Sequence, residues 1–97
     1  MRIEYHPALE GELREIRDYY DACSPGLGSE FVKALDRRVL EIASMPERWM
    51  LVTGDIRRSL LRRFPYVIYF RIIGPESIRI TVVKHGKRHP GYGLERR

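Results

Sequence analysis

The sequence predicts an α+β fold in which an N-terminal helical hairpin packs on a small antiparallel sheet, in the order β-α-α-β-β-β. Three observations predict it. Apolar residues recur at helical spacing in two stretches of the first half, and a glycine- and proline-rich segment separates these stretches. The second half holds runs of β-branched and aromatic residues, which favour strands. The length of 97 residues fits one domain, residues 1–97.

The chain begins with a predicted strand followed by a helix. Ile3 and Tyr5 alternate with polar residues over residues 2–6, which is the period of a half-buried strand. Pro7 stops this strand and suits the first turn of a helix, where its missing N–H costs little. Over residues 7–20 the apolar residues form one helical face: Leu9, Leu13, Ile16 and Tyr20.

A second helix follows a strong turn signal. The segment 23–28 reads Cys-Ser-Pro-Gly-Leu-Gly, which breaks the first helix. We expect the second helix to begin at Gly26 or Ser29 and to end at Met45, before Pro46. Its apolar stripe consists of Leu27, Phe31, Leu35, Val39 and Ile42. Two amphipathic helices joined by a short loop fold back as an antiparallel hairpin and pack their stripes together.

Three strands are predicted in the second half, over residues 56–64, 66–73 and 77–84. The sequence Gly-Pro-Glu at 74–76 supplies a hairpin turn between the last two. The middle strand is apolar on both faces, as a central strand should be. On the last strand, alternation places Ile78, Ile80 and Val82 on one apolar face. Trp49 and Met50 are expected to cover the open end of the core.

Composition and charge exclude some functions and favour others. No stretch of ~20 apolar residues is present for a membrane-spanning helix, and no apolar region marks an N-terminal signal peptide. With only Cys23 there is no internal disulfide, which suits a reducing cytoplasm, and we expect Cys23 to be partly buried without a catalytic role. The net charge of +5 divides into −3 for residues 1–50 and +8 for residues 51–97. The basic half either attracts phosphates or an acidic protein, or serves solubility alone.

The first group of candidate functional residues is a set of arginines on the predicted strands. Guanidinium groups suit phosphate because their donors match two oxygens at once. Alternation places Arg58 and Arg62 on one face of the strand and Arg57 and Arg63 on the other, so they do not all serve one site. Arg71 lies on the next strand, on the same face as Val67. The alternative interpretation is edge protection, in which charges discourage aggregation between strands.

The second group lies just beyond the last predicted strand. It holds residue types that RNA cleavage without metal uses, namely cations that stabilise phosphate charge and groups that move protons: Lys84, His85, Lys87, Arg88, His89 and Tyr92. The alternative is a polar loop whose histidines cap strand ends. His85 and His89 are four residues apart, a zinc spacing normally found on a helix, and the adjacent Gly86 and Pro90 indicate a loop. We therefore expect neither a metal nor a cofactor.

The whole pattern resembles the RelE/ParE toxin superfamily over about residues 3–93. The first part of the resemblance is Tyr19-Tyr20 followed by the Ser-Pro-Gly-Leu-Gly turn at 24–28 and by Phe31. The second part consists of Pro46, Arg57-Arg58, the string Arg-Phe-Pro-Tyr-Val-Ile-Tyr at 63–69, residues 78–83, and His85 with Arg88 and Pro90. The resemblance implies the same fold of two helices on a sheet. It also implies a bacterial toxin that is held inactive by a small antitoxin protein.

The resemblance allows two activities. In the RelE-like branch, which cleaves mRNA in the ribosome, the matching positions for catalytic groups are Arg58, Arg62, Arg88, Tyr92 and His85. That branch commonly has an arginine directly after the aromatic that opens the central strand, where this chain has Val67 after Tyr66. Valine neither binds phosphate nor donates a proton.

The Arg-Phe-Pro-Tyr string and the Ser-Pro-Gly-Leu-Gly turn are more similar to the ParE-like branch, which is associated with inhibition of DNA gyrase. We therefore favour the ParE-like interpretation, in which no residue is catalytic. The basic side chains then form a surface for the target or the partner: Arg57, Arg63, Arg71, Lys84 and Lys87. A third interpretation is an inactive or adaptor-type member. In each case we expect an antitoxin that lays an acidic segment, either extended or helical, over apolar positions on the sheet and the helical hairpin.

Overall fold

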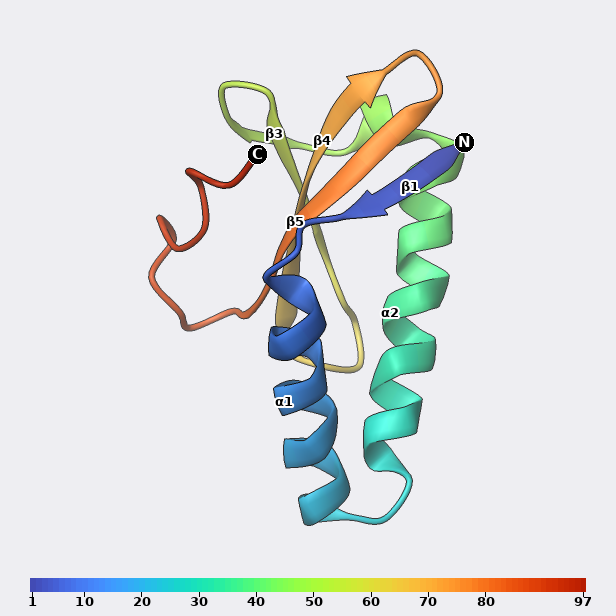
Figure 1. Cartoon of the computed structure of the whole chain (residues 1–97), viewed down its shortest axis with the longest axis vertical. Helices are drawn as coiled ribbons and strands as arrows, with labels where there is room; N and C mark the ends of the chain where they lie inside the picture. Colours follow the sequence, from blue (N-terminus) through green and yellow to red (C-terminus); the bar gives the residue numbers. More distant parts are fainter.

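The computed structural model describes residues 1–97 and confirms two helices followed by a sheet (Figure 1). The helices are α1 (Leu9–Cys23) and α2 (Leu27–Ser44), and a short 3-10 helix η1 (Pro46–Arg48) follows them. The strands are β1 (Arg2–Tyr5), β2 (Leu51–Thr53), β3 (Ile56–Leu60), β4 (Tyr66–Gly74) and β5 (Ser77–His85). Neither α1 nor α2 combines the length and apolar character that a membrane-spanning helix needs.

The sheet differs from the predicted one in two respects. Its strand order is β1-β5-β4-β3-β2, and β1 pairs with β5 in parallel, whereas every other pair is antiparallel. The strand β2 was not expected, because its three residues are all exposed and give no alternating pattern. Sequence periodicity indicates which face of a strand each side chain occupies, but not which strand lies beside it. The parallel pairing of β1 with β5 therefore could not be predicted either.

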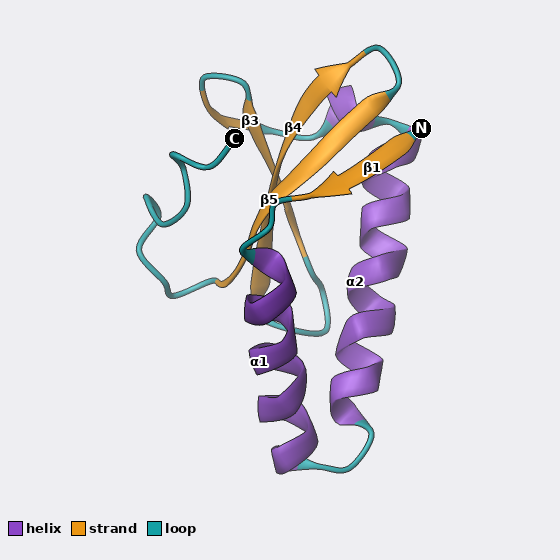
Figure 2. Cartoon of the chain, in the orientation of Figure 1, coloured by secondary structure: helices purple, strands orange, loops and turns teal.

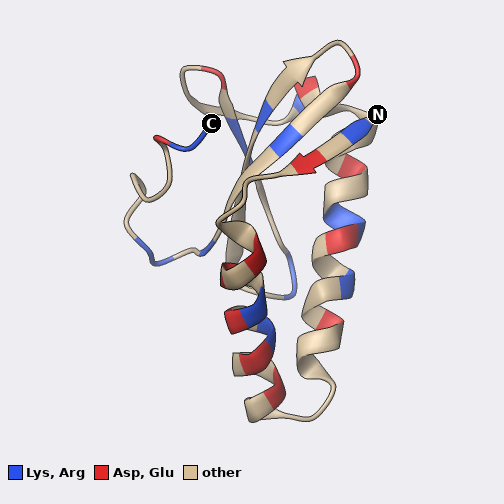
Figure 3. Ribbon diagram, viewed as in Figure 1, with Lys and Arg blue, Asp and Glu red and all other residues tan.

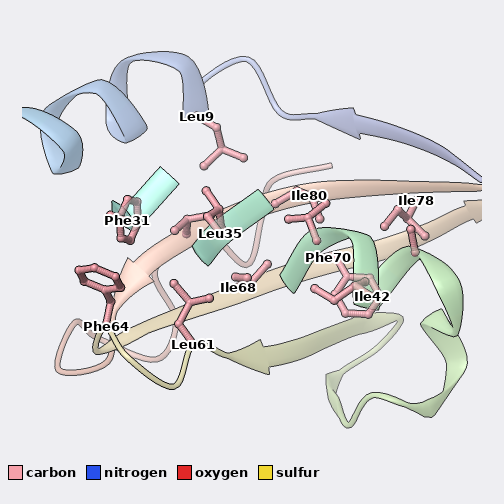
Figure 4. Close-up of a cluster of buried hydrophobic side chains, with 13 residues drawn as sticks. Leu9, Phe31, Leu35, Ile42, Leu61, Phe64, Ile68, Phe70, Ile78 and Ile80 are labelled. Atoms are coloured by element: carbon pink, nitrogen blue, oxygen red, sulfur yellow. The ribbon is translucent and has the colours of Figure 1, made fainter. Parts of the chain in front are cut away.

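Both helices cover one face of the sheet (Figure 2). Between them lies a cluster of 13 buried apolar residues contributed by both helices, β4, β5 and the 61–65 loop. Figure 4 shows Phe31 of α2 beside Phe64 at one end of this cluster, and Leu35 and Ile42 of α2 in the part that contains Ile68, Phe70 and Ile80 of the sheet. The helical stripes read from the sequence are therefore the residues that build this core.

The helical hairpin requires a glycine where α2 begins. A Cβ at Gly28 would lie 2.3 Å from the backbone carbonyl oxygen of Arg17, so only glycine allows α1 and α2 to approach this closely. The Gly28 N–H donates to Oδ1 of Asp21 at 2.8 Å, which ties the first turn of α2 to the end of α1. Cys23 ends α1 and is exposed, which corrects the expectation that it is partly buried.

Strand β5 contains an irregularity that changes the faces of its residues. Phe70 pairs with Ile80 and Tyr69 pairs with Val82, so Thr81 is an extra residue in β5. Beyond this bulge, Val83 faces the helices and Val82 faces the opposite side of the sheet. The prediction that Val82 shares a face with Ile80 is therefore wrong, because simple alternation does not anticipate a bulge.

Strand β3 ends at Leu60, four residues earlier than predicted. Leu61 and Phe64 turn into the helix-side core, and the Leu61 N–H bonds to the carbonyl of Tyr66. This turn places Arg62 and Arg63 on an exposed loop. The prediction that strand alternation separates them onto opposite faces is therefore corrected.

The far face of the sheet is covered by residues 86–97, which we call the strap. The strap has no helix or strand of its own and runs back along the sheet on the side away from the helices (Figure 2). Beneath it lie Ile56, Tyr69 and Val82, with Tyr92 and Leu94 of the strap packed against them.

Candidate partner-binding surfaces

A groove runs between α2 and the end of β3. It consists of two adjoining recesses of about 490 Å³ each, which share Arg38, Leu61 and Arg62 in their walls. The first recess lies between α2 and the 61–63 loop, and the second lies between η1 and the Ser59–Leu60 end of β3. We call the combined feature the cationic groove.

The charge in the cationic groove is strongly unbalanced. Its walls carry seven basic side chains, Lys33, Arg37, Arg38, Arg48, Arg58, Arg62 and Arg63. Only two acidic side chains, Glu30 and Glu41, accompany them. The resulting excess of five positive charges equals the net charge of the whole chain, +5. The charges of the remaining side chains therefore sum to zero, and the groove carries the net positive charge of the chain.

Four of these seven cations come from residues 1–50, whose net charge is −3. Lys33, Arg37 and Arg38 lie on α2 and Arg48 ends η1. Figure 3 shows more acidic than basic positions along α1, both kinds along α2, and basic positions on the turn near α2. Lys33 and Arg37 are four residues apart and therefore share one face of a helix, which could have indicated a basic surface on α2. The net charge of residues 1–50 does not show this surface, because acidic side chains elsewhere in those residues outnumber the cations.

The predicted arginines have different roles in the structure. Arg58 and Arg62 are exposed and line the cationic groove. Arg63 also lines the groove and pairs with Glu30 at 2.7 Å. Arg57 points elsewhere, because its guanidinium donates to the carbonyl oxygens of Glu47 and Trp49 at 3.0 and 2.8 Å. Arg57 thus fixes η1 and the loop behind the groove.

Trp49 forms part of the groove wall. The guanidinium carbons of Arg38 and Arg48 lie 5.4 and 4.9 Å from its ring centre, which is the distance of a cation–π contact. Trp49 also packs against the helix-side core, as expected from the sequence, whereas Met50 is 62% exposed and covers nothing. Met50 therefore lies at the rim as an apolar residue open to contact.

The strap is tied to the sheet by two predicted partner-binding cations. Lys84 is only 4% exposed, lies 4.4 Å from the Tyr69 ring centre and donates to the carbonyls of His89 and Pro90 at 2.9 Å each. Arg71 donates to the carbonyls of Leu94 and Arg96 and pairs with Asp55. Both cations are committed inside the molecule, which corrects the expectation that they form an exposed docking surface.

The carboxylate of Glu12 on α1 binds two side chains of the strap. Glu12 accepts hydrogen bonds from Arg96 and from the Tyr92 hydroxyl, each at 2.6 Å. The Arg96 guanidinium, helped by the Tyr92 hydroxyl and opposed by partial burial, lowers the pKa of Glu12 below its ordinary value of 4.5. The same hydrogen bond raises the pKa of Arg96. The contact therefore strengthens as Glu12 ionises.

Four further candidate residues, His85, Lys87, Arg88 and His89, lie at or just beyond the end of β5. The Arg88 guanidinium lies 4.0 Å from the Tyr92 ring centre, and the His85 ring packs edge-on against Tyr66. Nδ1 of His85 accepts from the Lys87 N–H, and the Lys87 side chain is exposed. Likewise Nδ1 of His89 accepts from the Gly91 N–H. Both histidines thus fix loop turns, in agreement with the polar-loop alternative.

The five candidate catalytic residues do not line a common cavity. Arg58 and Arg62 line the cationic groove, whereas His85, Arg88 and Tyr92 line a separate recess of about 190 Å³ together with Glu12 and Glu15. No group of three or more histidine, cysteine, aspartate or glutamate side chains is arranged to hold a metal ion.

Comparisons with known proteins agree with this architecture. Residues 3–90 match the family described as the ParE toxin of the type II toxin–antitoxin system parDE. A solved structure described as the chromosomal ParDE toxin–antitoxin system from P. aeruginosa has the same fold, with a TM-score of 0.76. It is 19% identical in sequence, and the match covers 88% of this chain and 95% of that one. No curated protein sequence matches the chain.

Proposed function

Since this chain belongs to the ParE toxin family of type II toxin–antitoxin systems, we propose that it arrests growth in the bacterial cytoplasm by inhibiting DNA gyrase. We further propose that a cognate antitoxin protein neutralises it and that residues 1–97 act as a single toxin domain. The observation that carries the proposal is the family match over residues 3–90, nearly the whole chain.

The placement of the candidate catalytic residues supports inhibition by binding over RNA cleavage. The Tyr92 hydroxyl donates a hydrogen bond to the Glu12 carboxylate and is therefore already bound within the chain. Val67 packs with the apolar cluster under the strap, at the position where the mRNA-cleaving branch commonly has an arginine. A nuclease site needs its catalytic groups around one phosphate, whereas Arg58 and Arg62 line a different recess from His85, Arg88 and Tyr92.

The test is expression of this chain in a bacterial host without its antitoxin. We expect growth arrest with intact messages, inhibition of supercoiling when the purified protein is added to DNA gyrase, and relief of arrest when the protein encoded beside this gene is co-expressed. Mapping of mRNA 5′ ends after induction gives the contrary outcome. New ends at a fixed position within codons would support the RelE-like alternative, and an Arg88→Ala/Tyr92→Phe variant should then lose them.

Continued growth at confirmed high expression, with messages and supercoiling unchanged, would support the inactive or adaptor-type interpretation. The strap variant Gly93→Ala serves as a control for fold-dependent effects, because it alters the far face of the sheet without touching the cationic groove.

A further inference from the structure

We propose that the cationic groove binds the phosphate backbone of duplex DNA without reading its sequence. This inference goes beyond the proposed function, because it names a ligand that binds this chain directly and is tested in the absence of gyrase. It also places the toxin on the DNA that its proposed target holds.

Four cations of the groove are available to contact phosphate. They are exposed and make no ion pair: Lys33, Arg37, Arg58 and Arg62. Lys33 and Arg37 lie on the α2 wall, whereas Arg62 lies on the opposite wall. The donors of a guanidinium group match two phosphate oxygens at once. A line of phosphates along the groove therefore finds cations on both sides.

The two acidic side chains in the walls are already balanced by cations. Glu30 pairs with Arg63 at 2.7 Å, and Glu41 pairs with Arg38 at 3.9 Å. The charge of the groove that remains without a partner is therefore positive. Such a charge attracts the phosphate backbone of any DNA sequence.

The length of the groove suits several phosphates of one strand. Its α2 wall extends from Glu30 to Glu41, which is roughly 16 Å at about 1.5 Å per residue. One strand of B-DNA carries a phosphate about every 3.4 Å along the helix axis. About four phosphates therefore lie along this wall, which is the number of unpaired cations in the groove.

The composition of the walls favours DNA over an acidic protein. In the first recess, seven of the nine lining residues are charged, and only Ala34 and Leu61 are apolar. The buried centres of protein–protein interfaces are depleted of charged residues. Protein–DNA interfaces are instead more polar and much more positively charged. The first recess therefore has the composition of a surface that binds a nucleic-acid backbone.

The aromatic content of the groove favours a duplex over a single strand. Proteins that bind single strands stack the bases on aromatic side chains. Trp49 is the one aromatic residue in the walls, and the guanidinium groups of Arg38 and Arg48 already contact its ring. Unpaired bases thus find no stacking surface. Contacts to phosphate remain, and these position a duplex without specifying its sequence.

The experiment compares the wild-type chain with two double variants. Arg37→Ala/Arg62→Ala removes unpaired cations of the groove, and Arg14→Ala/Arg97→Ala removes two exposed cations outside it. Both variants have the same net charge, so a difference between them reports the groove. Circular dichroism and thermal unfolding check that they are folded. Lys33→Ala/Arg58→Ala is a second groove variant, which replaces the first if that one is unfolded.

The probes are two fluorescent duplexes of unrelated sequence, each about 20 base pairs long, a single strand of one of them, and a labelled polyglutamate peptide. Fluorescence anisotropy measures binding over a series of salt concentrations. We expect wild type and Arg14→Ala/Arg97→Ala to bind both duplexes with similar affinity. Arg37→Ala/Arg62→Ala should bind them at least about tenfold more weakly at about 0.1 M salt. Its plot of log K against log salt should be shallower by about 2, because two phosphate contacts are lost.

Equal affinities and equal salt slopes for all variants would overturn the inference, as would the absence of duplex binding by wild type at about 50 mM salt. Tighter binding of the single strand or of polyglutamate than of the duplexes would also overturn it, because the groove would then prefer another ligand. Groove-dependent binding of duplex without inhibition of gyrase would support this inference and reject the proposed function. Inhibition of gyrase that is equal for wild type and all variants, without duplex binding, would do the reverse.

Discussion

The two faces of the sheet are closed by different interactions. On the helix side, the helices are held against the sheet by a core of 13 buried residues, all of them apolar. On the strap side the buried cluster has only three residues, and polar contacts of Arg71, Lys84 and Arg96 hold the covering segment. Apolar burial is roughly proportional to area and insensitive to pH, whereas ion pairs respond to pH and salt. We therefore expect the two faces to respond differently to mutation and to solution conditions.

The largest effect is expected on the helix side. Phe70→Ala removes a fully buried ring that β4 contributes to the core between the helices and the sheet. Such truncations cost about 3–5 kcal/mol, and urea unfolding measures this loss. Leu94→Ala on the strap side provides the matched comparison and should cost clearly less, because Leu94 is only partly buried. Equal losses would show that the two faces contribute alike.

The next effect tests the fit of the strap. Gly93 has φ +79°, and a Cβ there would lie 2.4 Å from Cγ2 of Val82. Gly93→Ala should cost about 2–4 kcal/mol, from the left-handed backbone and the overlap together. Hydrogen exchange should rise over residues 86–97 before it rises in α1 or α2. Simultaneous loss of protection in all segments would mean that the strap is not a separate unit.

A smaller loss is expected when the buried ammonium is removed. Lys84→Met keeps an unbranched side chain but removes the ammonium that donates to the carbonyls of His89 and Pro90. Hydrogen bonds from a charged group contribute about 1.5–3 kcal/mol, and urea unfolding measures this loss. Lys87→Met is the control, since the Lys87 side chain is exposed, and it should change stability little. A neutral Lys84→Met would contradict the anchoring role.

The carboxylate of Glu12 provides the pH-dependent comparison. Its folded-state pKa is lowered below the ordinary value of 4.5, so the stability it contributes is present above that ordinary value and is lost as pH falls through the folded-state pKa. Glu12→Gln should cost about 1 kcal/mol at pH 7, and the difference from wild type should vanish in acid. Urea midpoints measured from pH 7 to pH 2 test this. A difference that stays constant with pH would exclude the ionic explanation.

The smallest effect is expected at the surface of the groove. Arg63 and Glu30 form an exposed ion pair, and such pairs contribute roughly 0–1 kcal/mol. Arg63→Ala should therefore unfold within about 0.5 kcal/mol of wild type. A loss comparable to that of Lys84→Met would indicate that the groove stabilises the fold and would weaken its assignment as a binding surface.

The candidate site was only partly predictable. Arg58, Arg62 and Arg63 were identified because arginines are adjacent in the sequence and suit anions. Their companions on α2 were missed, because residues distant in sequence meet only when α2 packs beside the 61–63 loop. Conversely, Lys84 and Arg71 were indistinguishable from surface cations until the strap was seen to cover them.

The two helical stripes, the central position of β4 and the turn before α2 could be predicted from the sequence alone. These features follow from local periodicity and from residues such as Gly28 that act on their own segment or the next one. The parallel pairing of β1 with β5, the bulge at Thr81, the early end of β3 and the division of the cations between the groove and the strap became visible only in the folded chain. A charge or a strand edge acquires its role from neighbours that folding brings from elsewhere in the chain, and periodicity carries no information about those neighbours.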